Sequence, residues 1–244
     1  MLLKREGHVL LKRGEEVVAV RYVFGRFTRA AHWIRFAILI WLVVSGFYIA
    51  YPFLGRDFLT PTAFKFVQTY IRASHVLLGW VLIALTLVRI YEFLFVRSDG
   101  RLGLGDELRM GRVLFDRQAW REQIAYYVLL RKEHPVHVYS NYGPLQYLTY
   151  IALYLLILGI SVTGILLAAP YQPEGLAGTL AGVLKPLEIW MGGLAQVRIW
   201  HHWFMWGIIL FSVLHVYMVV WNSIRARTLL LEAMVSGYKA VEKP

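Results

Sequence analysis

Four long apolar segments constrain this chain more than any other feature of its sequence. They lie near residues 31–52, 75–96, 145–169 and 200–222. A helix needs about 20 apolar residues to cross a hydrocarbon core of about 30 Å, and each segment reaches that length. The segments are rich in Leu, Ile, Val and Trp and lack the alternation of barrel strands. Because backbone polar groups in lipid must be satisfied internally, the sequence predicts an all-α bundle of four transmembrane helices.

Most of the charges lie in the connections between these segments. Only 17% of residues are charged, and the net charge of +11 is spread over several connections, which argues against nucleic acid as a partner. Segments 1–30, 97–144 and 223–244 together hold 19 Lys and Arg residues, whereas 53–74 and 170–199 hold five. By the positive-inside rule, we expect a multi-pass protein of the cytoplasmic (inner) membrane with both termini in the cytoplasm.

These boundaries divide the chain into a cytoplasmic N-terminal arm (1–30), a four-helix membrane domain (31–222) and a cytoplasmic C-terminal tail (223–244). The arm lacks the short apolar core and cleavage site of a signal peptide, so no cleavage is expected. Its apolar and basic pattern predicts a hairpin that turns near Arg13–Gly14. Bases interleaved with aromatic residues predict an interfacial amphipathic helix over 111–130 and a similar one in the tail.

Histidine is the main candidate for metal binding, because the chain has no cysteine. An imidazole at membrane depth is costly unless it has a partner. The candidates are His32, His75, either His201 or His202, and His215. His201 and His215 are 14 residues apart, a separation that returns to within about 40° of one helix face after a rise of about 21 Å. Residue 202 would face elsewhere.

The expected topology arranges these histidines in two pairs. His75 and His201 belong to the non-cytoplasmic side, whereas His32 and His215 belong to the cytoplasmic side. Two facing imidazoles suit a six-coordinate haem, whose iron takes one axial ligand from each side. Zinc or copper usually requires a third protein ligand. The sequence therefore predicts that the bundle encloses two b haems, with these histidines as the iron ligands.

Arginines accompany the histidines. They stand three residues before or after a candidate ligand: Arg29, Arg35, Arg72 and Arg198. Their guanidinium groups are candidates for charge-assisted hydrogen bonds to haem propionates. The alternative is that these side chains extend to lipid phosphates.

A weak internal repeat relates the two helix pairs. Ser45–Gly46 precedes Pro52 in the same way that Thr163–Gly164 precedes Pro170, and each following helix has an arginine three residues before its histidine. The two helix pairs are therefore candidates for pseudo-symmetry. The alternative is that small residues and prolines recur through helix packing and capping alone.

Four stretches carry a resemblance to a known family. They are FTRAAHWIRFAILIWLVVSGFYIAYPF, YIRASHVLLGWVLIALTLVRIYEF, NYGPLQYLTYIALYLLILGISVTGILL and RIWHHWFMWGIILFSVLHVYMVVW. In the order and spacing of its histidines, the chain resembles the b-type cytochrome subunit of membrane-bound NiFe hydrogenases, a relative of the formate dehydrogenase gamma subunit. The resemblance runs from about residue 23 to 240 and implies the same four haem ligands. It further implies partners: an iron–sulfur small subunit, a NiFe large subunit and a membrane quinone, either menaquinone or ubiquinone.

The quinone site is expected on the cytoplasmic side. Asn141, Tyr142 and His134 are candidates to hydrogen-bond the quinone, and the non-ligating nitrogen of His215 is another. For Asn141, capping of the third transmembrane helix is an alternative role. The family often has a Gly-His-Asn-Pro-like motif here, whereas this chain reads Ser-Asn-Tyr-Gly-Pro.

Two other functions remain open. The first is a cytochrome b anchor of a formate dehydrogenase or a similar molybdoenzyme, which would use the same histidines. The second is a non-haem transporter or passive membrane anchor, whose histidines relay protons or hydrogen-bond between helices. Only the transporter or passive anchor predicts a colourless protein. Splitting of hydrogen is not expected in this chain, because the NiFe site of that family needs cysteines.

Overall fold

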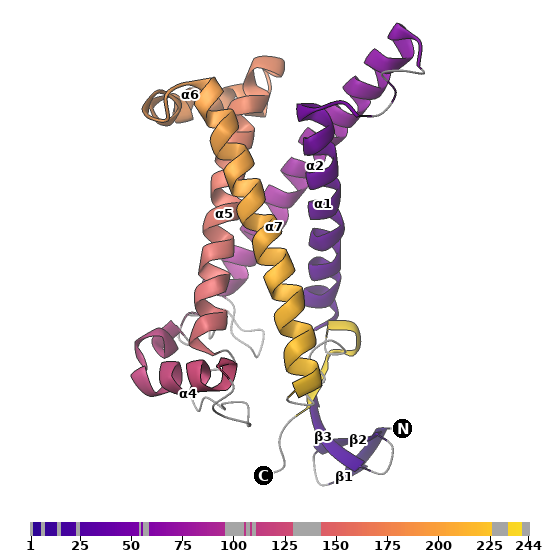
Figure 1. Cartoon of the computed structure of the whole chain (residues 1–244), viewed down its shortest axis with the longest axis vertical. Coiled ribbons are helices and arrows are strands. Elements are labelled where there is room, and N and C mark those ends of the chain that lie inside the picture. Colours follow the sequence, from indigo (N-terminus) through magenta and orange to yellow (C-terminus); the bar gives the residue numbers. More distant parts are fainter. Residues whose placement is uncertain are drawn as a thin grey trace. The chain divides into compact units, whose positions relative to one another are not determined.

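The structure is a computed structural model. It describes residues 2–5, 8–13, 16–22, 25–53, 55, 59–95, 105, 108, 111–128, 143–225 and 234–240. The chain divides into two compact units. One unit contains Met1–Phe36 and Ser212–Pro244, and the other contains Ala37–Phe211. Figure 1 labels most of the helices and strands.

Four long helices form the predicted spans: α1 (Arg26–Ala50), α2 (Pro61–Phe95), α5 (Pro144–Ala168) and α7 (Leu194–Arg225). In the described part of the chain, these are the helices long and apolar enough to cross a membrane. At most 17% of each spanning window is buried within the protein. Apolar surface left exposed on this scale suits lipid rather than water. The expected four-helix membrane architecture is confirmed.

Three of these helices begin earlier than the sequence predicts. α1 begins at Arg26 rather than near 31. α2 begins at Pro61 rather than near 75, and α7 begins at Leu194 rather than near 200. His75 and His201 therefore lie inside their helices and not at the helix starts. The physical reason is that hydropathy marks only the part of a helix that suits lipid. Hydrogen bonding propagates through polar residues as well, and a proline fits the first helical position.

The connection between α5 and α7 contains a helix that the sequence analysis does not predict. The short helix η2 (Ala169–Tyr171) follows α5, and α6 (Leu176–Trp190) follows η2. Gly192 and Gly193 have φ values of +93° and +87° after α6. This left-handed backbone suits glycine, and it ends the helix before α7 begins.

The amphipathic helix expected within 111–130 is present. It consists of η1 (Gly111–Phe115) and α4 (Arg117–Tyr127). The Asp116 side chain caps α4 by accepting hydrogen bonds from the backbone N–H groups of Gln118 at 2.9 Å and Ala119 at 3.1 Å. Buried Gln123 accepts a hydrogen bond of 2.8 Å from the backbone N–H of Leu145, in the first turn of α5. This side chain ties α4 to the start of a membrane helix.

The unit that contains both termini includes a small antiparallel sheet. Its described strands are β1 (Leu2–Arg5), β2 (His8–Arg13), β3 (Glu16–Tyr22) and β4 (Tyr238–Ala240), in the order β1-β2-β3-β4. The pairing of β2 with β3 confirms the predicted hairpin. The prediction of a helix in the C-terminal tail is wrong for the end of that segment, because Tyr238–Ala240 forms the strand β4 and pairs with β3. Gly237, at φ +90°, separates a short helical turn from this strand.

The tail also contacts the first membrane helix within this unit. The Arg29 guanidinium donates a hydrogen bond to the backbone carbonyl of Val235. The indole N–H of Trp33 donates to the carbonyl of Met234 at 3.0 Å. The N-terminal arm and the C-terminal tail, expected as separate parts, thus fold together around the start of α1.

We expect Gln123→Leu to destabilise the junction of α4 and α5. The variant keeps the side-chain size but leaves the buried N–H of Leu145 without its acceptor, which costs about 1–3 kcal/mol. Thermal unfolding of the detergent-purified protein would measure the change. The matched control is Gln118→Leu on the exposed face of α4, expected to change stability by less than about 0.5 kcal/mol. Equal effects of the two substitutions would contradict the assigned role of Gln123.

Candidate functional site

His75 on α2 and His201 on α7 face each other in one unit. Their ring centroids are 6.5 Å apart, with the ring planes at 60°. Metal–imidazole bonds of about 2.0–2.1 Å place the centroids of two imidazoles on opposite sides of one metal ion about 6 Å apart. The observed spacing therefore fits a single iron between the rings. The structure brings His201 to this position, whereas its neighbour His202 is not part of the pair.

Each of these rings has a hydroxyl partner on its Nδ1 atom. Ser45 Oγ lies 2.8 Å from Nδ1 of His75, and Thr163 Oγ1 lies 2.9 Å from Nδ1 of His201. In the sequence, Ser45 and Thr163 stand out only as members of a repeat, and their contact with the histidines is not predicted. The repeat was nevertheless the signal, because the two contacts occupy equivalent positions in the two helix pairs.

Glycines keep space open beside the same two rings. A Cβ atom added at Gly46 would lie 3.4 Å from Cε1 of His75, and one at Gly164 would lie 3.4 Å from Cε1 of His201. A Cβ at Gly79, one turn after His75, would have no neighbouring atom within 4 Å. Gly46 and Gly164 thus pack closely against the two rings, whereas the backbone at Gly79 faces open space.

His32 and His215 form the second pair, in the unit that contains both termini. Their ring centroids are also 6.5 Å apart, with the ring planes at 48°. Within the described residues, Nδ1 of His32 and Nε of Arg29 are buried atoms without a hydrogen-bond partner. Buried polar atoms are normally satisfied, so this pair suits a ligand that brings an acceptor for Arg29. A cofactor with carboxylate groups meets that requirement.

The four candidate arginines differ in their surroundings. Arg29 is partly buried and hydrogen-bonded to the tail, and Arg35 is partly buried on α1. Arg72 is exposed, with its guanidinium carbon 4.7 Å from the centroid of the Tyr171 ring, which is a cation–π contact. Arg198 is exposed on α7. Arg29 is therefore the arginine with the best structural support for a cofactor contact.

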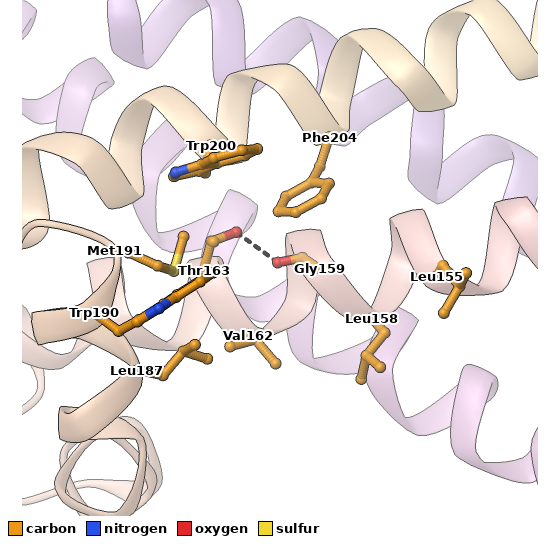
Figure 2. Close-up of a pocket in the computed structure, with 10 residues that line it drawn as sticks. All are labelled: Leu155, Leu158, Gly159, Val162, Thr163, Leu187, Trp190, Met191, Trp200 and Phe204. Atoms are coloured by element: carbon orange, nitrogen blue, oxygen red, sulfur yellow. Dashed lines mark hydrogen bonds between the residues drawn. The ribbon is translucent and has the colours of Figure 1, made fainter.

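A separate pocket of about 400 Å³ lies beside Thr163. Figure 2 shows Trp190, the last residue of α6, and Met191, the residue after it, together with Trp200 and Phe204 of α7, around this space. Its lining is almost entirely apolar. The pocket therefore offers little to hydrogen-bond a polar ligand.

Of the four expected quinone residues, His215 is the one that lies among the described residues. Asn141, Tyr142 and His134 lie outside the described residues. His215, the remaining candidate, is placed in the pair with His32. Within the described part of the chain, no group of three or more His, Asp or Glu side chains could hold a metal ion. The two imidazole pairs are thus the candidate metal sites that the structure supports.

Comparison with known proteins agrees with this arrangement. A probable Ni/Fe-hydrogenase B-type cytochrome subunit of Rhodobacter capsulatus is 28% identical over 229 residues, covering 89% of this chain and 80% of the relative. The Ni/Fe-hydrogenase 1 counterpart of Escherichia coli K12 is 25% identical over 239 residues, covering 94% and 95%. That of Azotobacter vinelandii is 29% identical over 225 residues, covering 89% and 88%. The family model described as prokaryotic cytochrome b561 matches residues 23–237, so this multi-pass membrane protein belongs to that family.

Proposed function

We propose that this chain is the b-type cytochrome subunit of a NiFe hydrogenase. In this role it receives electrons from the iron–sulfur small subunit, which is bound to the NiFe large subunit, and delivers them to the membrane quinone pool. The proposal rests on two pairs of facing imidazoles, His75 with His201 and His32 with His215. In each pair the ring centroids are 6.5 Å apart. The names of the relatives favour a hydrogenase over a formate dehydrogenase as the partner.

In this proposal the chain holds two b haems through its own side chains. His75 and His201 bind one iron, and His32 and His215 bind the other. A bound haem supplies one-electron transfer between ferric and ferrous iron. Arg29 would donate a hydrogen bond to a propionate from its buried Nε, which lacks a partner among the described residues. The apolar helices exclude water from the irons.

The direction of transfer follows from the distribution of basic residues. Segments 1–30, 97–144 and 223–244 hold most of the Lys and Arg, which supports a cytoplasmic location for the His32 and His215 pair. Electrons then enter at His75 and His201 from the non-cytoplasmic face. Quinone is reduced on the cytoplasmic side, near Asn141, Tyr142 and His134. Because quinone reduction consumes protons, uptake from the cytoplasm would make the reaction charge-separating.

We expect the purified chain to contain two haems b. His75→Ala or His201→Ala should remove one haem, and His32→Ala or His215→Ala the other, because each iron then loses an axial ligand. A haem assay and a reduced-minus-oxidised absorption spectrum would measure this. His202→Ala is the matched control and should retain both haems. A colourless wild-type protein would support the transporter or anchor instead, and haem loss from the His202 variant would contradict the pairing.

We expect the non-cytoplasmic end of α7 to contact the iron–sulfur subunit. Trp200, His202 and Trp203 lie about two turns inside this helix, and aromatic residues are common in interfaces. A photo-crosslinker at position 202 should yield adducts with a small subunit that co-purifies with a NiFe large subunit. Adducts with lipid alone would remove the docking role, and a co-purifying molybdoenzyme would identify the alternative partner.

We expect Asn141→Ala to slow quinone reduction, because the amide no longer hydrogen-bonds a quinone carbonyl. Loss of a neutral hydrogen bond costs about 0.5–1.5 kcal/mol, so the rate should fall by a factor between about two and about ten. Steady-state assays with a quinone analogue would measure this. Reduction of an artificial dye should continue at the wild-type rate, because both haems remain. Unchanged quinone turnover would exclude Asn141 from the site.

A further inference from the structure

One contact occurs twice in the unit Ala37–Phe211. A hydroxyl on the first helix of each pair lies beside the imidazole on the second, so that Ser45 on α1 contacts His75 on α2, and Thr163 on α5 contacts His201 on α7. Ser45 is 2% exposed and Thr163 is 1% exposed. Both hydroxyls are therefore shielded from bulk solvent.

The hydrogen bonds of each hydroxyl determine which atom donates. Ser45 Oγ lies 2.6 Å from the Trp41 carbonyl, and Thr163 Oγ1 lies 2.8 Å from the Gly159 carbonyl, the bond drawn in Figure 2. A carbonyl only accepts, and a hydroxyl has a single proton to donate. The hydroxyl oxygen therefore accepts a hydrogen bond from the imidazole. This requires the proton of each neutral ring to be on Nδ1.

An imidazole protonated on Nδ1 has a free lone pair on Nε2. That is the form of histidine that binds iron through Nε2, and no proton must leave before binding. A hydrogen bond from Nδ1–H also holds the ring in one orientation and makes the imidazole a stronger electron donor. Nδ1 of His32 has no such partner among the described residues. Among the described residues, His75 and His201 therefore have a hydroxyl partner on Nδ1, whereas His32 does not.

We propose that Ser45 and Thr163 are positioning residues for the haem-binding histidines. They fix the Nδ1–H tautomer and the ring orientation of His75 and His201, and they strengthen both rings as iron ligands. The inference rests on the proposed function, since it concerns how the chain holds a haem. It also applies to the haem-free protein, because the hydrogen bonds involve the chain's own residues alone.

The first test removes each hydroxyl in the full-length purified protein. Ser45→Ala and Thr163→Val should make the midpoint potential of the haem bound to His75 and His201 more positive, because weaker ligand donation stabilises ferric iron less. Retention of that haem should weaken by about 10–100-fold, the usual effect of removing an outer-shell partner. The potential of the other haem should not change. Its signal can be assigned with the His75→Ala variant.

Conservative variants and a matched control separate positioning from general stability. Ser45→Thr and Thr163→Ser keep a hydroxyl and should restore the wild-type potential. Thr86→Val on α2 removes another buried hydroxyl, which donates to its own helix at 2.7 Å from the Leu82 carbonyl, and should leave the potential unchanged. The proposal is overturned by an unchanged potential in the Ala and Val variants. An equal shift in the Thr86 variant, or no rescue by the conservative variants, would also overturn it.

A second measurement needs no haem. Nitrogen-15 NMR of the histidine-labelled, haem-free protein distinguishes the two tautomers, with assignment by single substitution. His75 and His201 should be in the Nδ1–H form in the wild type and in a mixture of forms after Ser45→Ala or Thr163→Val. A wild-type Nε2–H form would overturn the inference even if haem binds. Absence of haem from the wild type would instead refute the proposed function while the tautomers are still measurable.

Discussion

The cost of a polar group away from water is the constraint on which this structure depends. A helix in lipid satisfies its own backbone, so side chains with donors and acceptors must find partners on neighbouring helices. Ser45, Thr86 and Thr163 meet part of this requirement by donating to carbonyls of their own helices. The hydroxyl oxygens of Ser45 and Thr163 can still accept a hydrogen bond. An imidazole from the next membrane helix donates it. The need to satisfy buried polar atoms thereby leaves Nε2 of His75 and of His201 as the atom that can bind a metal.

The sequence predicts the parts of the fold that depend on local pattern. Apolar length identifies each membrane helix, and helical periodicity separates His201 from His202. The starts of α2 and α7 could not be read in the same way, because a helix continues through polar residues after its apolar segment ends. The strand β4 depends on a non-local pairing in which Arg21 lies opposite Lys239. No pattern within a short window reports a partner that lies so far along the chain.

The candidate site shows the same division between local and non-local information. The histidine pairs follow from spacing and topology, and both are present at one centroid distance. The roles of Ser45 and Thr163 required the contact between helices, although their repeat was visible in the sequence. Arg29 and Arg72 have equivalent sequence positions, three residues before a histidine. Only the fold shows that the tail contacts Arg29, whereas Arg72 lies over Tyr171.

The two pairs share a spacing but differ in how completely the protein satisfies them. At His75 and His201 the chain supplies a partner for each Nδ1 atom. At His32 and Arg29, two buried nitrogen atoms lack partners among the described residues. Each unsatisfied group costs about 1–3 kcal/mol, and a ligand that supplies an acceptor there recovers part of that cost. Because Arg29 also holds the C-terminal tail, ligand binding at this pair would stabilise the unit that contains both termini. Binding of such a ligand would therefore be coupled to folding of the termini through a single side chain.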